Sequence, residues 1–197
     1  MRVLVVGASG HVGRVAVAAL AEGNDIVAVS RSTEPSVDVT DPSSIERLFE
    51  VLGPFDAIVS AIGSVPFLPL DQLSREDYLS AFRGKVLSQL DLVRIGEPHM
   101  RDGGSFTLTS GILSRVAIAT GSAAAMANGA LESFVLAAAR ELPRGIRINV
   151  VSPSVLEDAP AYHDAFPGFI PVTSRAVGAA FVRSVRGVET GVTFAVD

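Results

Sequence analysis

Short apolar runs alternate with amphipathic stretches along the whole chain. The runs are rich in β-branched residues and end at turn residues, as buried strands do: 2–8, 25–30, 55–63, 104–110, 145–153 and 191–197. Apolar residues at helical spacing predict helices between them: 12–23, 43–52, 74–96, 121–142 and 173–185. Asp41 and Pro42 are typical of an N-cap and a first helical position. This alternation predicts one α/β domain over residues 1–197, with a doubly wound, mostly parallel sheet between two helix layers.

The turn after the first strand, GASGHVG (7–13), holds Gly7, Gly10 and Gly13. In such a turn one glycine tolerates positive φ, a second lets the backbone approach a pyrophosphate, and a third lets helix and sheet pack closely. A bland tight turn is the alternative, but the strand–turn–helix context favours a Rossmann-type nucleotide site. The site is expected to include Ser9, His11 and Val12. An aspartate at Gly13 is expected to abolish nucleotide binding.

The end of the second strand indicates which dinucleotide is bound. An acidic residue there would hold a ribose 2′-hydroxyl, whereas this chain has Ser30, Arg31 and Ser32. A cation between two hydroxyls favours NADP(H) over NAD(H), although a solvated surface arginine is the alternative. Asp38 and Val39 fall where an adenine contact is expected.

The least regular region is 154–172, rich in proline and aromatic residues and placed after a strand's carboxyl end. Folds of this kind bind ligands at that edge, so the region is predicted to be a substrate lid. Phe166, Phe169 and Ile170 suggest an apolar pocket wall for an unknown small molecule.

Composition narrows the function classes. A formal charge of −5 and a pI near 5.2, with scattered cations, disfavour nucleic acid as a partner. The absence of cysteine and three separated histidines disfavour a metal site. No apolar run reaches the roughly 18 residues of a membrane span, and the chain starts on a strand rather than a signal peptide. We expect a cytoplasmic protein with no membrane partner.

Several motifs in order resemble the short-chain dehydrogenase/reductase family. GASGHVG is similar to its phosphate turn, and SAIG (60–63) stands at its Asn-Asn-Ala-Gly strand end. Thr109-Ser110 stands where the catalytic serine ends a strand, and RGIRINVVSP (144–153) resembles the run before its Pro-Gly turn. The resemblance implies a nicotinamide cofactor, contacts from Ala61, Ile62, Gly63 and Pro153, and a carbonyl or alcohol substrate.

The family's Tyr-x-x-x-Lys pair is missing. Aligned on that helix, Ala124 stands at the tyrosine position and Asn128 at the lysine position, while Lys85 lies on the preceding helix near the usual catalytic asparagine. In polyketide-type ketoreductases the catalytic lysine and asparagine exchange positions, with lysine on the earlier helix and asparagine on the later one. Lys85, Ser110 and Asn128 therefore resemble that swapped set without its tyrosine. The chain also resembles a short bacterial subgroup that lacks the catalytic tyrosine.

Three functions remain open: an NADP(H)-dependent oxidoreductase with an atypical site, a catalytically inactive NADP(H)-binding sensor or regulatory protein, and a structural partner. Lys85, Ser110 and Asn128 favour the enzyme. In that case Tyr162 or His163 could supply an acid from the lid. The alternative is that both are packing and surface residues. By resemblance, a homodimer or homotetramer is expected through the helices holding Lys85 and Asn128. Their small-residue faces are expected to allow close packing, at Ala123, Ala127 and Ala130.

Overall fold

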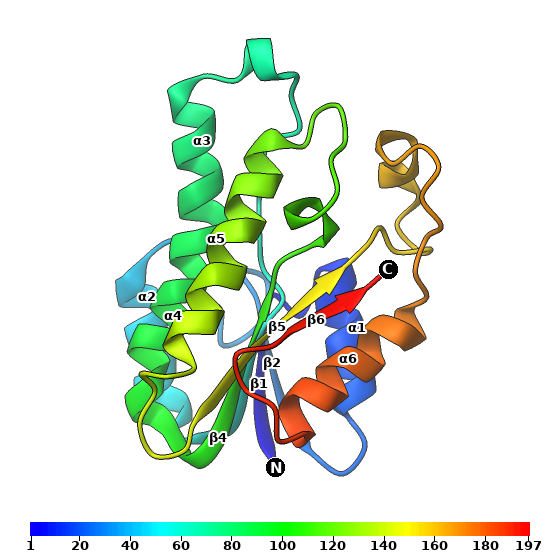
Figure 1. The fold of residues 1–197 in the computed structure, drawn as a ribbon. Helices are drawn as coiled ribbons and strands as arrows, with labels where there is room; N and C mark the ends of the chain where they lie inside the picture. The colour runs from blue at the N-terminus through cyan, green and yellow to red at the C-terminus, as the bar shows by residue number, and fades with distance from the viewer.

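The computed structural model describes all 197 residues and holds one six-stranded, fully parallel sheet between two layers of helices (Figure 1). The strands are β1 (Arg2–Val6), β2 (Asp25–Val29), β3 (Phe55–Ser60), β4 (Met100–Thr109), β5 (Arg147–Pro153) and β6 (Thr193–Val196). Their order is β2-β1-β3-β4-β5-β6. The predicted doubly wound α/β fold is confirmed.

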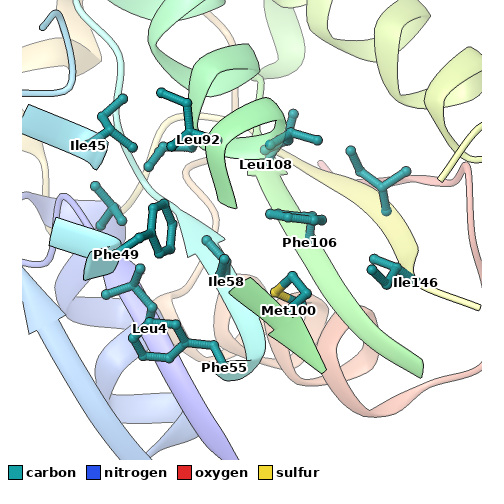
Figure 2. Close-up of a cluster of buried hydrophobic side chains, with 14 of the residues drawn as sticks. Leu4, Ile45, Phe49, Phe55, Ile58, Leu92, Met100, Phe106, Leu108 and Ile146 are labelled. Atoms are coloured by element: carbon teal, nitrogen blue, oxygen red, sulfur yellow. The ribbon is translucent and has the colours of Figure 1, made fainter. Parts of the chain in front are cut away.

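Side chains alternate along the strands and divide the core into two. Val3 and Val5 of β1 pack on α1 (His11–Leu20) and α6 (Ser174–Arg186), whereas Leu4 and Val6 face the opposite layer. That layer consists of α2 (Pro42–Leu52), α4 (Ser88–Gly96) and α5 (Ser122–Ala138). Figure 2 shows its aromatic centre, where Phe49, Phe55 and Phe106 meet side chains of the sheet.

The predicted helix signals are confirmed at α2 and need correction at α1. Asp41 accepts a hydrogen bond from the Ser43 amide at 3.0 Å, and Pro42 is the first helical residue. α1 ends at Leu20, so Gly23 lies beyond the helix, where its φ of +73° forms the turn into β2.

The stretch predicted as one helix over 74–96 is three consecutive pieces. It begins as α3 (Arg75–Ala81), widens to a π turn at Phe82–Leu87 and continues as α4. A π turn carries one extra residue per turn and often marks a functional position in a helix. Here it contains Lys85, close to the carboxyl ends of β3 and β4.

The carboxyl edge of the sheet is where a ligand site is expected. β2 and β3 lie on opposite sides of β1, so the chain reverses direction across the sheet at β1 and β3. Loops diverge at such a point and leave a crevice beyond the strand ends. α3, α5 and the segment after β5 rise above this edge (Figure 1). None of the helices has the length and apolarity that a membrane crossing requires.

Candidate cofactor and active site

The glycine turn shows three different reasons for glycine. Gly7 has a φ of +84°, and a Cβ there would lie 2.5 Å from the Ala61 carbonyl oxygen. A Cβ at Gly13 would lie 2.1 Å from the Gly7 oxygen. At Gly10 the nearest atom to a Cβ is 3.4 Å away, and its φ of −74° suits any residue. The fold therefore requires Gly7 and Gly13, whereas nothing in the protein itself requires Gly10.

This geometry corrects the expectation for Gly13. Its α-carbon faces the Gly7 backbone rather than the space above helix α1, so an aspartate there would break the turn itself. Gly10 is the N-cap of α1 and borders open space at the helix's positive end. A pyrophosphate approaching this backbone would explain the glycine at position 10.

A nucleotide-sized cleft of about 460 Å³ lies over the turn. It collects predicted residues from four separate segments: Gly7, Ser9, Gly10, Ser30, Arg31, Ser32, Asp38, Val39, Ala61, Ile62 and Gly63. Arg31 is exposed at its border and forms no ion pair. The Ser30 and Ser32 hydroxyls lie 3.1 Å apart. The far end of the cleft thus offers an unpaired cation beside two hydroxyl groups.

Asp38 carries a stable negative charge in the same cleft. Its carboxylate accepts hydrogen bonds from the Thr40 hydroxyl at 2.7 Å and the Thr40 amide at 2.9 Å. These bonds, with a smaller contribution from the Arg31 charge, hold the pKa of Asp38 below its usual value.

A second cavity of about 400 Å³ continues from the first and shares Gly10, Ala61, Ile62 and Gly63 with it. The remaining predicted residues line this cavity: His11, Val12, Lys85, Ser110, Asn128 and Pro153. Its other walls are largely apolar and come from Val65, Phe67, Ile112, Leu113, Val155, Leu156 and Phe166. The structure therefore places every predicted site residue at one of two connected clefts, apart from Gly13 beneath the turn.

Lys85 is the only lysine of the chain. Its stem lies over Gly63, where a Cβ would come within 3.0 Å of the Lys85 Cδ. The ammonium donates a hydrogen bond to the Ser110 carbonyl oxygen at 3.0 Å and forms no ion pair. Burial lowers the pKa of Lys85 to about 8, an effect that the charge of Glu132 partly offsets. Lys85 is therefore a cation that can exchange its proton near neutral pH.

Ser110 is buried and its hydroxyl is already engaged. It donates a hydrogen bond to Glu132 Oε1 at 2.7 Å. The same carboxylate oxygen accepts from the Ser114 hydroxyl at 2.8 Å and the Ser152 hydroxyl at 2.9 Å. The Arg115 guanidinium lies 3.5 Å from it. Glu132 thus accepts hydrogen bonds from hydroxyl groups at or just beyond the ends of β4 and β5.

Asn128 lines the cavity with an unsatisfied polar atom. The residue is 3% exposed, and its Oδ1 is buried without a hydrogen-bond partner. Such an atom costs about 1–3 kcal/mol unless a ligand or water satisfies it. Ala124, one turn earlier on α5, is 2% exposed and offers only a methyl group to the cavity.

Sequence reasoning missed Glu132 and Gln89. Gln89 Nε2 donates to the Thr109 carbonyl at 2.9 Å, and its Oε1 accepts from the Thr109 amide at 3.0 Å, which ties α4 to the end of β4. Glu132 could have been found, because it follows Asn128 by one helical turn on the same face. Nothing in the spacing of Gln89 indicates its role.

The predicted lid region forms a 3₁₀ segment, Pro160–Ala165, beside the cavity. Tyr162 lines the cavity and is 50% exposed. His163 does not line it, and its Nε2 lies 2.8 Å from the Leu156 carbonyl oxygen. The position of His163 agrees with a packing role rather than a second acid.

The outer surfaces of α4 and α5 differ from the expectation for self-association. Ala123 and Ala127 are fully buried inside the subunit, so they cannot form a face for close packing with another copy. The outward residues of α5 include Met126 and Leu136. A shallow hollow between the two helices is lined by Leu87, Leu90, Val93, Phe134, Ala138 and Leu142.

The fold, with its two connected clefts at the carboxyl edge of the sheet, is a Rossmann-type α/β fold. A family model described as enoyl-(acyl carrier protein) reductase matches residues 2–186. The chain belongs to the short-chain dehydrogenase/reductase family.

Relatives extend over different lengths. An uncharacterized oxidoreductase of Schizosaccharomyces pombe is 28% identical over 83% of this chain and 70% of its own length. The chain spans about half the length of a hydroxynaphthalene reductase-like protein of Metarhizium brunneum, which is 29% identical over 68% of this chain.

Solved structures match over the full chain. A protein of Listeria innocua, lin1944, is 42% identical with a TM-score of 0.98, and both chains are covered completely. A small-chain dehydrogenase in complex with NADPH is 25% identical with a TM-score of 0.88, covering 100% of this chain and 96% of that one. A short-chain dehydrogenase of Burkholderia cenocepacia in complex with NADP is 25% identical with a TM-score of 0.84, with the same coverage.

Proposed function

We propose that this protein is an NADP(H)-dependent oxidoreductase that reduces a small carbonyl compound or oxidises the matching alcohol. Gly10 carries the proposal. It is a glycine that the fold does not need, at a helix N-terminus, where both clefts meet. A dinucleotide that crosses from one cleft to the other would bring its pyrophosphate to this residue. The complexes of two relatives with NADPH and NADP support the same choice of ligand.

Arg31 supports a preference for the 2′-phosphorylated cofactor. Its guanidinium forms no ion pair, although the Asp38 charge lies near it, and a guanidinium matches the geometry of a phosphate monoester. Ser30 and Ser32 would add hydroxyl donors at the same end. Asp38 and Val39 would border the adenine.

The apolar cavity would receive the substrate and the nicotinamide end of the cofactor, which supplies or accepts a hydride when bound. Lys85, Ser110 and Asn128 bring polar groups to that end, while Ala124 leaves the tyrosine position without one. The apolar wall excludes water and suits an aromatic or aliphatic carbonyl compound. The hydroxynaphthalene reductase-like relatives support including bicyclic aromatic ketones in a substrate screen.

A titration with NADPH and NADH, followed by calorimetry, tests the proposal. We expect micromolar binding of NADPH and weaker binding of NADH. Hydride transfer is then followed by NADPH absorbance with aromatic and aliphatic carbonyl compounds. Binding of neither cofactor would reject the proposal. Binding without any reduction would instead support a non-catalytic NADP(H)-binding sensor.

We also propose that residues 1–197 act as one domain and that the segment 154–172 closes over the bound substrate.

Two copies of the chain are further proposed to associate through the hollow between α4 and α5. Replacing Phe134 with glutamate puts a charge into that hollow. Light scattering during gel filtration should then show a smaller mass than for the original protein. An unchanged mass would reject this surface as the interface.

A further inference from the structure

The proposed reaction needs a proton donor, and Ala124 supplies none. Reduction of a carbonyl compound leaves negative charge on oxygen, which a donor close to that oxygen must neutralise. Six residues that line the cavity carry an exchangeable ammonium, imidazole or hydroxyl proton: His11, Lys85, Thr109, Ser110, Ser154 and Tyr162. The Thr109 hydroxyl donates to the Ser60 carbonyl oxygen at 2.7 Å, and the Ser154 hydroxyl is an aliphatic alcohol, a much weaker acid than an ammonium group. The inference below rests on the proposed function and asks which of them serves.

The Ser110 hydroxyl already donates its one hydrogen bond to an acceptor outside the cavity. A hydroxyl group has one proton to donate, and that of Ser110 is directed to Glu132 Oε1 at 2.7 Å. The hydroxyl therefore offers the cavity lone pairs rather than a proton. In this arrangement Ser110 can accept a hydrogen bond from a substrate but cannot protonate one.

The network around Glu132 keeps the serine in that state. Ser114 and Ser152 donate to the same carboxylate oxygen, with the Arg115 guanidinium beside it. Arg115 is itself fixed, because it donates to the Ser152 hydroxyl at 2.7 Å and to Asp197 at 2.8 Å. Glu132 does not itself line the cavity, so its role is to hold these hydroxyl groups in place.

Tyr162 and His11 are less suited to the role. Tyr162 is half exposed on the 3₁₀ segment Pro160–Ala165. His11 is exposed on the first turn of α1, and its Nδ1 faces Arg14 at 3.3 Å. Both side chains are therefore largely exposed to solvent, whereas the Lys85 stem packs against Gly63.

Lys85 combines a fixed position with free protons. Its ammonium has three protons, and only one is engaged, with the Ser110 carbonyl oxygen at 3.0 Å. The stem is held against Gly63, and the π turn directs the residue toward the ends of β3 and β4. It is also the only lysine, where the other fifteen of the sixteen cationic residues are arginines that cannot release a proton.

We propose that Lys85 is the proton donor in place of the tyrosine, and that Glu132 is a positioning residue that holds the Ser110 proton away from the reaction. The carbonyl carbon takes a hydride from the reduced nicotinamide of the proposed function, the C=O π pair moves to oxygen, and that oxygen takes a proton from Lys85 Nζ. The products are the alcohol, the oxidised nicotinamide and a neutral amine, which regains its proton from solvent. In the oxidative direction the neutral amine takes the alcohol's proton.

The pH dependence follows from the charge of the active form. Reduction needs the ammonium, so its rate is full well below the Lys85 pKa of about 8 and falls as the pH rises through that value. Oxidation needs the neutral amine and rises over the same range. Glu132 on α5 is the negative group that faces Lys85, so Glu132→Gln should lower the Lys85 pKa. His11 and Tyr162 are the other titratable groups of the cavity.

The Lys85 titration can be measured without turnover. Protein labelled with ¹³C-lysine gives one lysine Cε signal, because the chain has one lysine. We expect its midpoint near pH 8 in the protein without cofactor, and a lower midpoint in Glu132→Gln. Glu46→Gln is the matched control, since it removes an exposed carboxylate on α2. An ordinary lysine midpoint, or no change in Glu132→Gln, would overturn the proposal.

Kinetics then identify the donor. With 4-nitrobenzaldehyde as the probe and NADPH bound in advance, Lys85→Met should slow reduction about 100-fold or more. Lys85→Arg should be similarly slow, because a guanidinium keeps its proton. Ser110→Ala should cost about fivefold or less, since a hydrogen-bond acceptor alone is lost. In Glu132→Gln the pH midpoint of the rate should move together with the NMR midpoint.

The results separate this inference from the proposed function. If Ser110→Ala is as slow as Lys85→Met, or Lys85→Arg keeps full activity, the proton assignment is wrong while the oxidoreductase stands. If NADPH binds but the probe is never reduced, the assignment falls together with catalysis, and cofactor binding remains. If NADPH does not bind, both fall. NADPH affinity and melting temperature of each variant show whether a loss comes from misfolding.

Discussion

The two connected clefts share four lining residues but are built in different ways. The nucleotide cleft is made largely of backbone, with Gly7, Gly10 and Gly13 setting its shape and two charged side chains, Arg31 and Asp38, at its far end. The second cavity, of about 400 Å³, is the proposed reacting cavity. It is made of side chains from the π turn at Phe82–Leu87, the end of β4 and helix α5. A backbone-built site tolerates few sequence changes, whereas a side-chain site can exchange its chemical groups while the fold persists.

The largest expected effect separates the glycines of the nucleotide cleft from one another. Gly13→Ala places a Cβ against the fixed Gly7 oxygen, so we expect it to lower the free energy of unfolding by about 3 kcal/mol or more. Gly10→Ala meets no protein atom closer than 3.4 Å and should cost about 1 kcal/mol or less. Thermal and urea unfolding measure both.

Gly10→Ala should change cofactor affinity strongly, although it changes stability little. This variant should remain folded but bind NADPH about tenfold or more weakly, because its methyl group occupies the surface that the pyrophosphate approaches. Calorimetric titration of the folded variant measures the loss. If Gly10→Ala binds NADPH like the original protein, the phosphates do not lie over this turn.

The fold and the nucleotide cleft could be predicted because their causes are local. Buried parallel strands appear as apolar runs, and the Gly7–Gly13 turn is a single short segment between a strand and a helix. The helix start at Asp41 was equally local. The π turn was not predictable, because helical spacing of apolar residues continues through 82–87 and the widening depends on contacts with other elements.

The reacting cavity could be predicted only in part. Resemblance pointed to Lys85, Ser110 and Asn128, which the structure brings to one cavity. It did not indicate that Ser110 donates to Glu132, because this bond joins residues 22 positions apart through packing of α5 on the sheet. The buried position of Ala127 likewise depends on how α5 is rotated, which a helix of mostly small apolar residues does not specify.

A smaller effect is expected at the far end of the nucleotide cleft. Arg31→Ala removes an exposed cation without an ion pair, so stability should change by about 0.5 kcal/mol or less. Binding of NADPH should weaken about tenfold to a hundredfold, as for loss of a charge-assisted hydrogen bond, with NADH binding unchanged. Titrations with both cofactors test this. Equal weakening for NADH would mean that Arg31 does not contact the 2′-phosphate.

Introducing a tyrosine at Ala124 tests how the reacting cavity works, and its expected effect is the smallest of these predictions. Ala124 is 2% exposed at the cavity wall beside Ile112, Leu113 and Val155, so a tyrosine would fill space intended for substrate. Because we assign the proton to Lys85, a phenol should add no needed group, and the rate of carbonyl reduction should fall about tenfold through weaker substrate binding. Stopped-flow measurement at saturating NADPH, with cofactor affinity and melting temperature as controls, gives the result. A faster variant would mean that the missing tyrosine limits the reaction and that Lys85 had not replaced it.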